Sequence, residues 1–148
     1  MCRVLVIDDE TDVLIAVSRR LEREGFEVTP AANSEQGVAK ILEAPQLYDV
    51  IVSDMSMENP ASGLEVLQAA FSRDLFAQVI IMTAYGSVGN AVECMRRGAF
   101  DYIEKNVPGV DTFELLVEKV TQAMAQRRRD LRTVQQWERA AESKARMP

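Results

Sequence analysis

The strongest constraint on the fold of this 148-residue chain is the alternation of short apolar segments with segments of helical periodicity. The predicted strands are Val4–Ile7, Glu27–Ala31, Val50–Ser53, Val79–Met82 and Asp101–Glu104. The predicted helices are Thr11–Glu24, Ser34–Ala44, Gly63–Phe71, Ser87–Arg97 and a last helix that runs onward from Thr112. Strands that alternate with helices are joined by right-handed crossovers and lie parallel. Near-continuous apolar strands indicate a sheet covered on both faces.

The second strand contains Pro30, which has no backbone N–H to donate and is therefore confined to a sheet edge or a strand end. This position supports the strand order 2-1-3-4-5. The predicted fold class is thus α/β, a three-layer sandwich around a five-stranded parallel sheet. In such sheets chemistry takes place at the carboxyl ends of the strands, where the strand order reverses. Ser34 is the predicted N-cap of the second helix.

Composition excludes several classes of site. The chain has no histidine, so it cannot form His-based zinc sites or Ser–His and Cys–His nucleophile pairs. The two cysteines, Cys2 and Cys94, have no metal or redox spacing, and their scarcity suits a reducing cytoplasm. The N-terminal residues do not resemble a signal peptide, and no apolar run is long enough to span a membrane. We therefore expect a cytoplasmic protein.

The net charge of −6 is unevenly distributed. Residues from Arg127 onward carry a net charge of +4, whereas residues 1–126 carry −10. The acidic body argues against a nucleic-acid-binding surface on the domain itself. The basic tail is better explained as a solvated helix face, although contact with nucleic acid is an open alternative.

Polar residues follow four of the five predicted strands. They are Asp8 and Asp9, Asp54, Thr83 and Lys105. Parallel strand ends converge on one edge of the sheet, so three carboxylates would repel one another unless a cation or protons relieved the repulsion. Oxygen ligands with room for water favour Mg²⁺ over zinc. We expect Asp8, Asp9 and one oxygen of Asp54 to bind Mg²⁺.

A metal ion alone does not explain Thr83 and Lys105. A phosphoryl group does, because its oxygens need donors that a hydroxyl, an ammonium group and Mg²⁺ supply. The second oxygen of Asp54 would then be the nucleophile, giving an aspartyl phosphate. Each residue alone has an ordinary explanation as a cap, a turn residue or a solvated charge. The set at four strand ends points to phosphoryl chemistry.

Four stretches of residues 3 to about 125 resemble the receiver domains of two-component response regulators. They are Val4–Glu10, Val52–Met55, Ile81–Gly86 and Arg97–Lys105. The resemblance implies the flavodoxin-like receiver fold. It also implies a signalling switch in which a sensor histidine kinase phosphorylates Asp54. The stretch from Met82 to Lys105 is most similar to receivers of nitrogen-regulator-type transcription activators.

The resemblance assigns further roles residue by residue. Asp8, Asp9, Asp54 and the backbone carbonyl of Ser56 would bind Mg²⁺. Thr83, Lys105 and the backbone of Ala84 would contact the phosphoryl group, and Thr83 and Tyr102 would form the switch. That switch would alter the face formed by the fourth helix, fifth strand and fifth helix. Such a domain supports only its own phosphotransfer and dephosphorylation. A phosphohydrolase usually places a second acid at the position of Ser56.

Two loops depart from the family pattern. Glu58 stands where the family usually has proline, which adds an acid near the metal ligands. Asn106 follows Lys105 where the family usually has a proline after a cis bond. A cis bond before Asn would cost roughly 2.5–4 kcal/mol. We therefore expect a trans bond and a rebuilt loop.

The chain is interpreted as a receiver domain over 1–125 and a helical extension or linker over 126–148. Apolar residues at three- and four-residue spacing suggest a coiled-coil seam, which Arg127 and Glu138 weaken. The seam positions are Val117, Val120, Met124, Arg127, Leu131, Val134, Glu138 and Ala141. A homodimer through the fourth helix–fifth strand–fifth helix face or through the C-terminal helix is open. So is the alternative of a phosphate-independent interaction module.

Overall fold

A computed structural model describes residues 2–55, 61–84 and 88–146 of the chain. The strands are β1 (Arg3–Ile7), β2 (Glu27–Ala31), β3 (Val50–Asp54), β4 (Gln78–Thr83) and β5 (Asp101–Glu104). The helices are α1 (Thr11–Arg23), α2 (Ser34–Glu43), α3 (Ser62–Arg73), α4 (Val88–Arg96) and α5 (Thr112–Ala145). All the strand pairs are parallel and the order is β2-β1-β3-β4-β5, which confirms the predicted topology.

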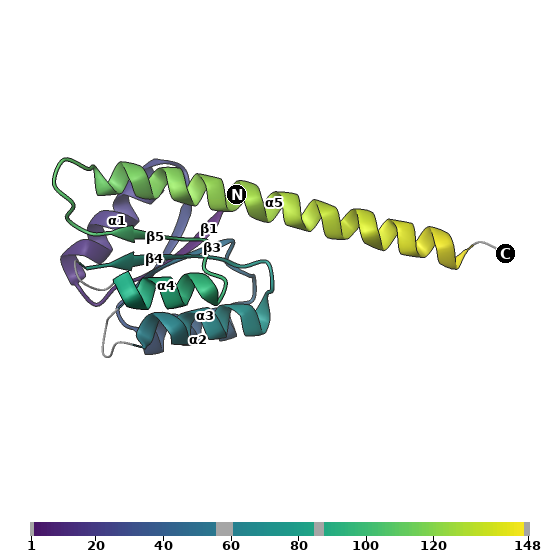
Figure 1. Cartoon of the computed structure of the whole chain (residues 1–148), viewed down its shortest axis with the longest axis horizontal. Coiled ribbons are helices and arrows are strands. Elements are labelled where there is room, and N and C mark those ends of the chain that lie inside the picture. Colours follow the sequence, from purple (N-terminus) through teal and green to yellow (C-terminus); the bar gives the residue numbers. More distant parts are fainter. Residues whose placement is uncertain (1, 56–60, 85–87, 147–148) are drawn as a thin grey trace.

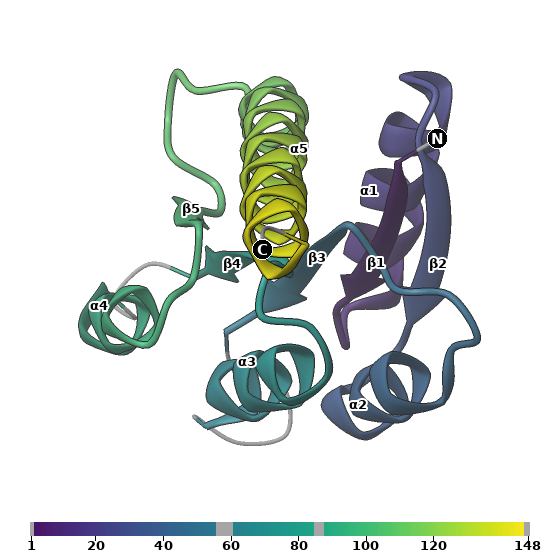
Figure 2. The ribbon, with the colours of Figure 1, turned by 90° about the vertical axis from the view of Figure 1, so that its right-hand side faces the viewer.

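The sheet is the middle of three layers, with α1 and α5 on one face and α2, α3 and α4 on the other (Figure 2). Successive residues of β1 point into opposite layers. Leu5 and Ile7 are buried with residues of α2, α3 and α4, whereas Val4 and Val6 are buried with residues of α1 and α5. Both faces of each central strand are therefore dry, which is why these strands are apolar without alternation.

Strand β2 occupies one edge of the sheet, as Pro30 predicts. Pro30 is exposed and its Cα pairs with that of Val6 in the register of β1 and β2. At an edge, the N–H that proline lacks is not needed by a further strand.

The N-cap of α2 is Asn33, so the assignment of that cap to Ser34 is wrong. Asn33 has extended backbone, and its side-chain oxygen accepts the N–H of Gln36 at 2.8 Å. The Gln36 side chain in turn accepts the N–H of Ala32 at 3.1 Å. The reciprocal bonds satisfy two backbone donors at the start of the helix, which makes residue 33 the preferred cap. Ser34 is instead the first residue of the helix and is buried.

Helix α5 continues without a break across residues 125 and 126 and extends past the body (Figure 1). The Arg127 side chain is buried against the body, where Nε lies 2.9 Å from Asp49 Oδ1 and a terminal nitrogen 2.7 Å from Asp74 Oδ2. Arg127 therefore anchors the helix to its own domain and is not an irregularity in a free coiled-coil seam. No helix within the described ranges combines the length and apolar character that a membrane span needs.

Candidate functional site

The polar residues at the strand ends meet at the carboxyl edge of the sheet. Asp8 follows β1, Asp54 ends β3, Thr83 ends β4 and Lys105 follows β5. One carboxylate oxygen from each of Asp8, Asp9 and Asp54 lies within 4.8 Å of the others. Asp8 and Asp54 are buried, whereas Asp9 is exposed. The predicted cluster of three carboxylates thus forms at the predicted edge.

Lys105 lies between two of these carboxylates. Its ammonium nitrogen is 2.9 Å from Asp8 Oδ2 and 3.3 Å from Asp54 Oδ1. Sequence reasoning paired Lys105 only with a phosphoryl group and missed its contact with Asp8. The contact could have been predicted from the parallel topology. Because all the strands are parallel, β1 and β5 end at the same edge of the sheet, even though β3 and β4 lie between them.

The loop after Lys105 is built without a cis bond. The peptide bond to Asn106 is trans, as predicted, and Asn106 adopts a positive φ of 59°. Asparagine tolerates this left-handed conformation better than most residues with a side chain. The backbone N–H of Lys105 also donates to the Thr83 carbonyl at 2.7 Å. The rebuilt loop therefore still directs Lys105 into the carboxylate cluster.

Asp8 has a second, structural role. Its Oδ1 accepts the backbone N–H of Glu10 at 2.9 Å, just before α1 begins. The opposite oxygen, Oδ2, faces Lys105. One carboxylate thus positions the start of a helix and contributes to the cluster.

Burial raises the pKa of Asp54 to about 6 from its usual 3.8. The Lys105 ammonium opposes that rise, while the charges of Asp8 and Asp9 add to it. For Lys105 burial lowers the pKa, but the hydrogen bond to Asp8 and the charges of Asp54 and Asp8 outweigh it and raise the pKa above its usual value. Lys105 therefore stays charged while Asp54 is easily protonated. A cation bound beside Asp54 would favour its ionised form, which burial disfavours.

Thr83 is fully buried, and its hydroxyl has no hydrogen-bond partner among the described residues. A buried hydroxyl without a partner is unfavourable, since it loses its bonds to water. Its position at the end of β4 next to the cluster suits a group that gains a partner when a ligand arrives.

The Thr83→Val variant should be more stable than the wild-type protein by about 1 kcal/mol when no phosphoryl ligand is present. Valine keeps the shape and removes only the unpaired hydroxyl. Urea unfolding measures the difference. Thr121→Val is the matched control, because the Thr121 hydroxyl donates to the Val117 carbonyl at 2.8 Å and is exposed. A Thr83→Val protein less stable than the wild type would show that the Thr83 hydroxyl has a stabilising partner.

The remaining predicted residues lie around this cluster. Ala84 is exposed and directly follows β4. Tyr102, on β5, is half-buried and packs against the core on the α2–α3–α4 side. Ser56 and Glu58 lie outside the described residues.

Neither cysteine is a competing nucleophile. Both thiols are free and buried, and burial raises the pKa of each to about 11. Such thiols are protonated at neutral pH, and the protonated form is a poor nucleophile.

A parallel α/β sheet with an acidic cluster and a lysine at its carboxyl edge defines a receiver-type domain. Residues 4–121 match the model of the response regulator receiver domain family, and the chain belongs to this family. It is therefore a receiver domain of two-component systems.

Curated relatives include regulatory proteins and response regulators. The acid tolerance regulatory protein ActR of Rhizobium meliloti is 32% identical over 116 residues, which cover 78% of this chain and 58% of ActR. A putative NtrX-like response regulator of Rickettsia bellii is 36% identical over 102 residues, covering 69% of this chain and 21% of that protein. The chain is thus similar to receivers of nitrogen-regulator-type activators. It spans less than two thirds of the length of each of these relatives.

Solved structures share the fold. A receiver domain protein from Clostridium thermocellum superposes with a TM-score of 0.78 at 32% identity, covering 86% of this chain and 98% of the other. The response regulator TrrA from Thermotoga maritima, solved in complex with Mg²⁺–BeF, gives a TM-score of 0.68 at 28% identity. That match covers 83% of this chain and 99% of TrrA.

Proposed function

We propose that this receiver domain is a phosphorylation-dependent switch that accepts a phosphoryl group on Asp54 from a sensor histidine kinase, with Mg²⁺ as cofactor. The observation that carries the proposal is the cluster itself. Three carboxylates lie within 4.8 Å of one another, and the ammonium of Lys105 contacts both Asp8 and Asp54. If these residues only capped separate helices or turns, their side chains would have no reason to meet at one place.

The donor set suits Mg²⁺. Asp8, Asp9 and Asp54 offer only carboxylate oxygens, the exposed Asp9 leaves access for water, and the pKa of Asp54 is raised. The backbone carbonyl of Ser56 is proposed as a further ligand. The relative TrrA is described in complex with Mg²⁺–BeF, which supports the same choice of cation. When bound, Mg²⁺ would supply positive charge that offsets the carboxylates and the phosphoryl oxygens.

In the proposed transfer, a carboxylate oxygen of Asp54 attacks the phosphorus atom of a phosphohistidine on the kinase. The new O–P bond forms as the P–N bond breaks, and the bonding electrons return to the imidazole nitrogen. The Lys105 ammonium, the Thr83 hydroxyl and the Ala84 N–H would donate hydrogen bonds to the phosphoryl oxygens. The domain accelerates this step by position and charge, and we propose no turnover of other substrates.

The unpaired hydroxyl of Thr83 supports a switch. A phosphoryl group would offer it a hydrogen-bond acceptor, and the space that Thr83 leaves would admit the ring of Tyr102. Both residues belong to strands β4 and β5, so this rearrangement would shift the α4–β5–α5 face between two populated states. The exposed side chains of Val92 and Met95 lie on α4 and make the face a candidate surface for a homodimer or an output partner.

Incubation with acetyl phosphate and Mg²⁺ tests the proposal. Intact-mass analysis should show a gain of one phosphoryl group in the wild-type chain and none in Asp54→Asn. Asp12→Asn, which removes an exposed carboxylate from the first turn of α1, should still gain it. Chelation of Mg²⁺ should also prevent the gain. A wild-type chain that gains no mass contradicts the mechanism.

Beryllofluoride, which mimics a phosphoryl group, distinguishes the phosphorylation-dependent switch from a phosphate-independent interaction module. The switch predicts that NMR signals of β4, β5 and α4 shift when beryllofluoride and Mg²⁺ are added. Identical spectra and identical oligomeric mass in both conditions would favour a phosphate-independent interaction module. Steady hydrolysis of a phosphate ester would instead favour the phosphohydrolase class.

A further inference from the structure

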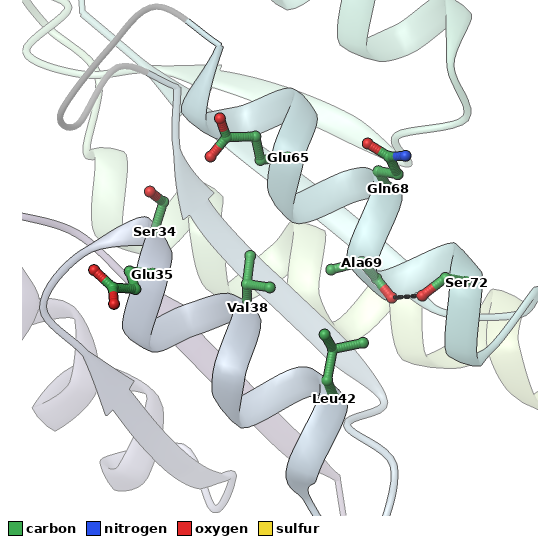
Figure 3. Close-up of a pocket in the computed structure, with 8 residues that line it drawn as sticks. All are labelled: Ser34, Glu35, Val38, Leu42, Glu65, Gln68, Ala69 and Ser72. Carbon is green, nitrogen blue, oxygen red and sulfur yellow. Dashed lines mark hydrogen bonds between the residues drawn. The ribbon is translucent and has the colours of Figure 1, made fainter.

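An apolar groove runs between α2 and α3 on the face of the molecule opposite α5. Its volume is about 520 Å³. Val38 and Leu42 form one wall and Ala69 of α3 lies across from them (Figure 3). Leu42 is 52% exposed, which is high for a leucine beside other apolar groups. The groove thus presents an uncovered apolar surface.

One end of the groove is acidic. Glu35 of α2 and Glu65 of α3 line it there, together with Ser34, and none of the described residues that line the groove is a lysine or arginine (Figure 3). Gln68 and Ser72 complete the α3 side. A matching ligand would therefore carry an apolar ridge flanked by positive charge.

The part of α5 beyond Arg127 carries an apolar ridge flanked by positive charge. The residues that α5 buries against the body are Leu116, Val120, Ala123 and Arg127, at spacings of four, three and four. The same spacing continues this face to Leu131, Val134 and Ala141 after the body has ended, with Glu138 as the one polar residue between Val134 and Ala141. Trp137 lies beside that stripe, three residues from Val134, and is 69% exposed. Leu131 and Val134 are half-buried and Ala141 is exposed, so the described part of the body leaves this stripe at least partly uncovered.

A basic stripe runs along another face of the same helix segment. It consists of Arg128, Arg132, Arg139 and Arg146, at spacings of four and seven residues. The whole segment from Arg127 is positively charged in a chain whose body is strongly negative. Long arginine side chains at the border of the apolar stripe can reach carboxylates beside a bound helix.

We propose that the α2–α3 groove binds the C-terminal helical extension (residues 128–145) of a second copy of this chain. The chain's own extension cannot reach the groove, because α5 is one continuous helix on the opposite face of the sheet (Figures 1 and 2). Pairing of two extensions would bring their like-charged basic stripes together. The groove offers an apolar floor and opposite charge instead.

The arrangement closes as a two-fold dimer. In Figure 1 α5 lies along the top of the body and points past its end, while α2 and α3 lie along the bottom. A two-fold axis perpendicular to that view inverts the second body, so each extension crosses the α2–α3 face of the other copy. The reciprocal contact uses both extensions and leaves no open end for further copies.

The lengths are compatible. The extension from Arg128 to Ala145 spans roughly 27 Å of helix. Helices α2 and α3 contain 10 and 12 residues, or roughly 15 and 18 Å. One extension therefore covers the whole groove. Neither Asp54 nor Thr83 lines the groove, so this contact does not depend on the proposed phosphorylation.

The single tryptophan of the chain gives a direct test on the full-length protein. As concentration rises, sedimentation should show a monomer converting to a dimer, and Trp137 emission should shift to shorter wavelength as the ring leaves water. Leu42→Lys should weaken the dimer about tenfold or more, because it places a charge in an apolar contact. Leu75→Lys is the matched control, since Leu75 is 79% exposed and lies outside the groove. The control should behave as the wild-type chain does.

A mixing experiment distinguishes the groove from pairing between extensions. Trp137→Ser has no tryptophan, so all the emission in a mixture with Leu42→Lys comes from the latter chain. Excess Trp137→Ser should restore the blue shift, because its intact groove accepts the intact extension of Leu42→Lys. A wild-type chain that is monomeric with water-exposed Trp137 at all concentrations overturns the proposal. So does a Leu42→Lys chain that dimerises as tightly as the control.

Discussion

Arg127→Met should lower the free energy of unfolding by about 3 kcal/mol. The guanidinium is 2.9 Å from Asp49 and 2.7 Å from Asp74, and its side chain is only 6% exposed. Methionine preserves much of the packing but leaves two largely buried carboxylates without their cation. Each retains one backbone donor, from Arg3 to Asp49 and from Phe76 to Asp74, which limits the loss. Urea unfolding followed by circular dichroism measures the change.

Arg128→Met is the matched control for this prediction. Arg128 is the next residue of the same helix and is exposed, so its replacement should change stability by less than about 0.5 kcal/mol. The triple variant Arg127→Met with Asp49→Asn and Asp74→Asn should recover part of the stability, because no unpaired charge is left. Equal losses for Arg127→Met and Arg128→Met would show that the two ion pairs do not hold α5 to the body.

Asp54→Asn should raise the free energy of unfolding by about 3 kcal/mol near neutral pH when divalent cations are absent. Asp54 is 6% exposed and its pKa is about 6, against a usual 3.8. The folded protein therefore holds the Asp54 proton more tightly than the unfolded chain does, and ionised Asp54 destabilises the fold. Asparagine has nearly the same shape and carries no charge.

The pH dependence follows from the direction of that shift. The stability that protonated Asp54 contributes is fully present below pH 3.8 and is lost as the pH rises through about 6. Wild type and Asp54→Asn should thus be closest in stability in acid and diverge between these values. Urea unfolding across this range measures the divergence. A constant difference at all pH values would contradict the raised pKa.

At neutral pH, added Mg²⁺ should make the wild-type protein more stable than Asp54→Asn. A cation that binds only the folded wild-type site stabilises it by mass action, and Asp54→Asn lacks one of the proposed ligands. Glu118→Gln, an exposed change on α5 far along the chain from the cluster, should leave both the pH profile and the Mg²⁺ response as in the wild type. Stabilisation of Asp54→Asn by Mg²⁺ to the wild-type extent would show that Asp54 is not part of the cation site.

The strand order and the cluster at the sheet edge were predictable because the signals are local. Apolar runs mark β1, β3 and β4, Pro30 marks an edge, and topology alone carries Asp8, Asp54 and Lys105 to one edge. The cap of α2 was not predictable to the residue. Asn33 and Ser34 are both good capping residues, and the extended backbone of Asn33, with Gln36 placed to reach back, decides between them.

The sequence by itself determined the α/β class, the parallel order of the strands and the convergence of three carboxylates and a lysine, because periodicity and strand-end chemistry are properties of short segments. Only the tertiary structure decided that Lys105 bridges Asp8 and Asp54 and that Thr83 is buried without a partner. It also decided that Arg127 belongs to the body and not to a seam. These outcomes depend on distances between residues far apart in the chain, and no local pattern encodes such distances.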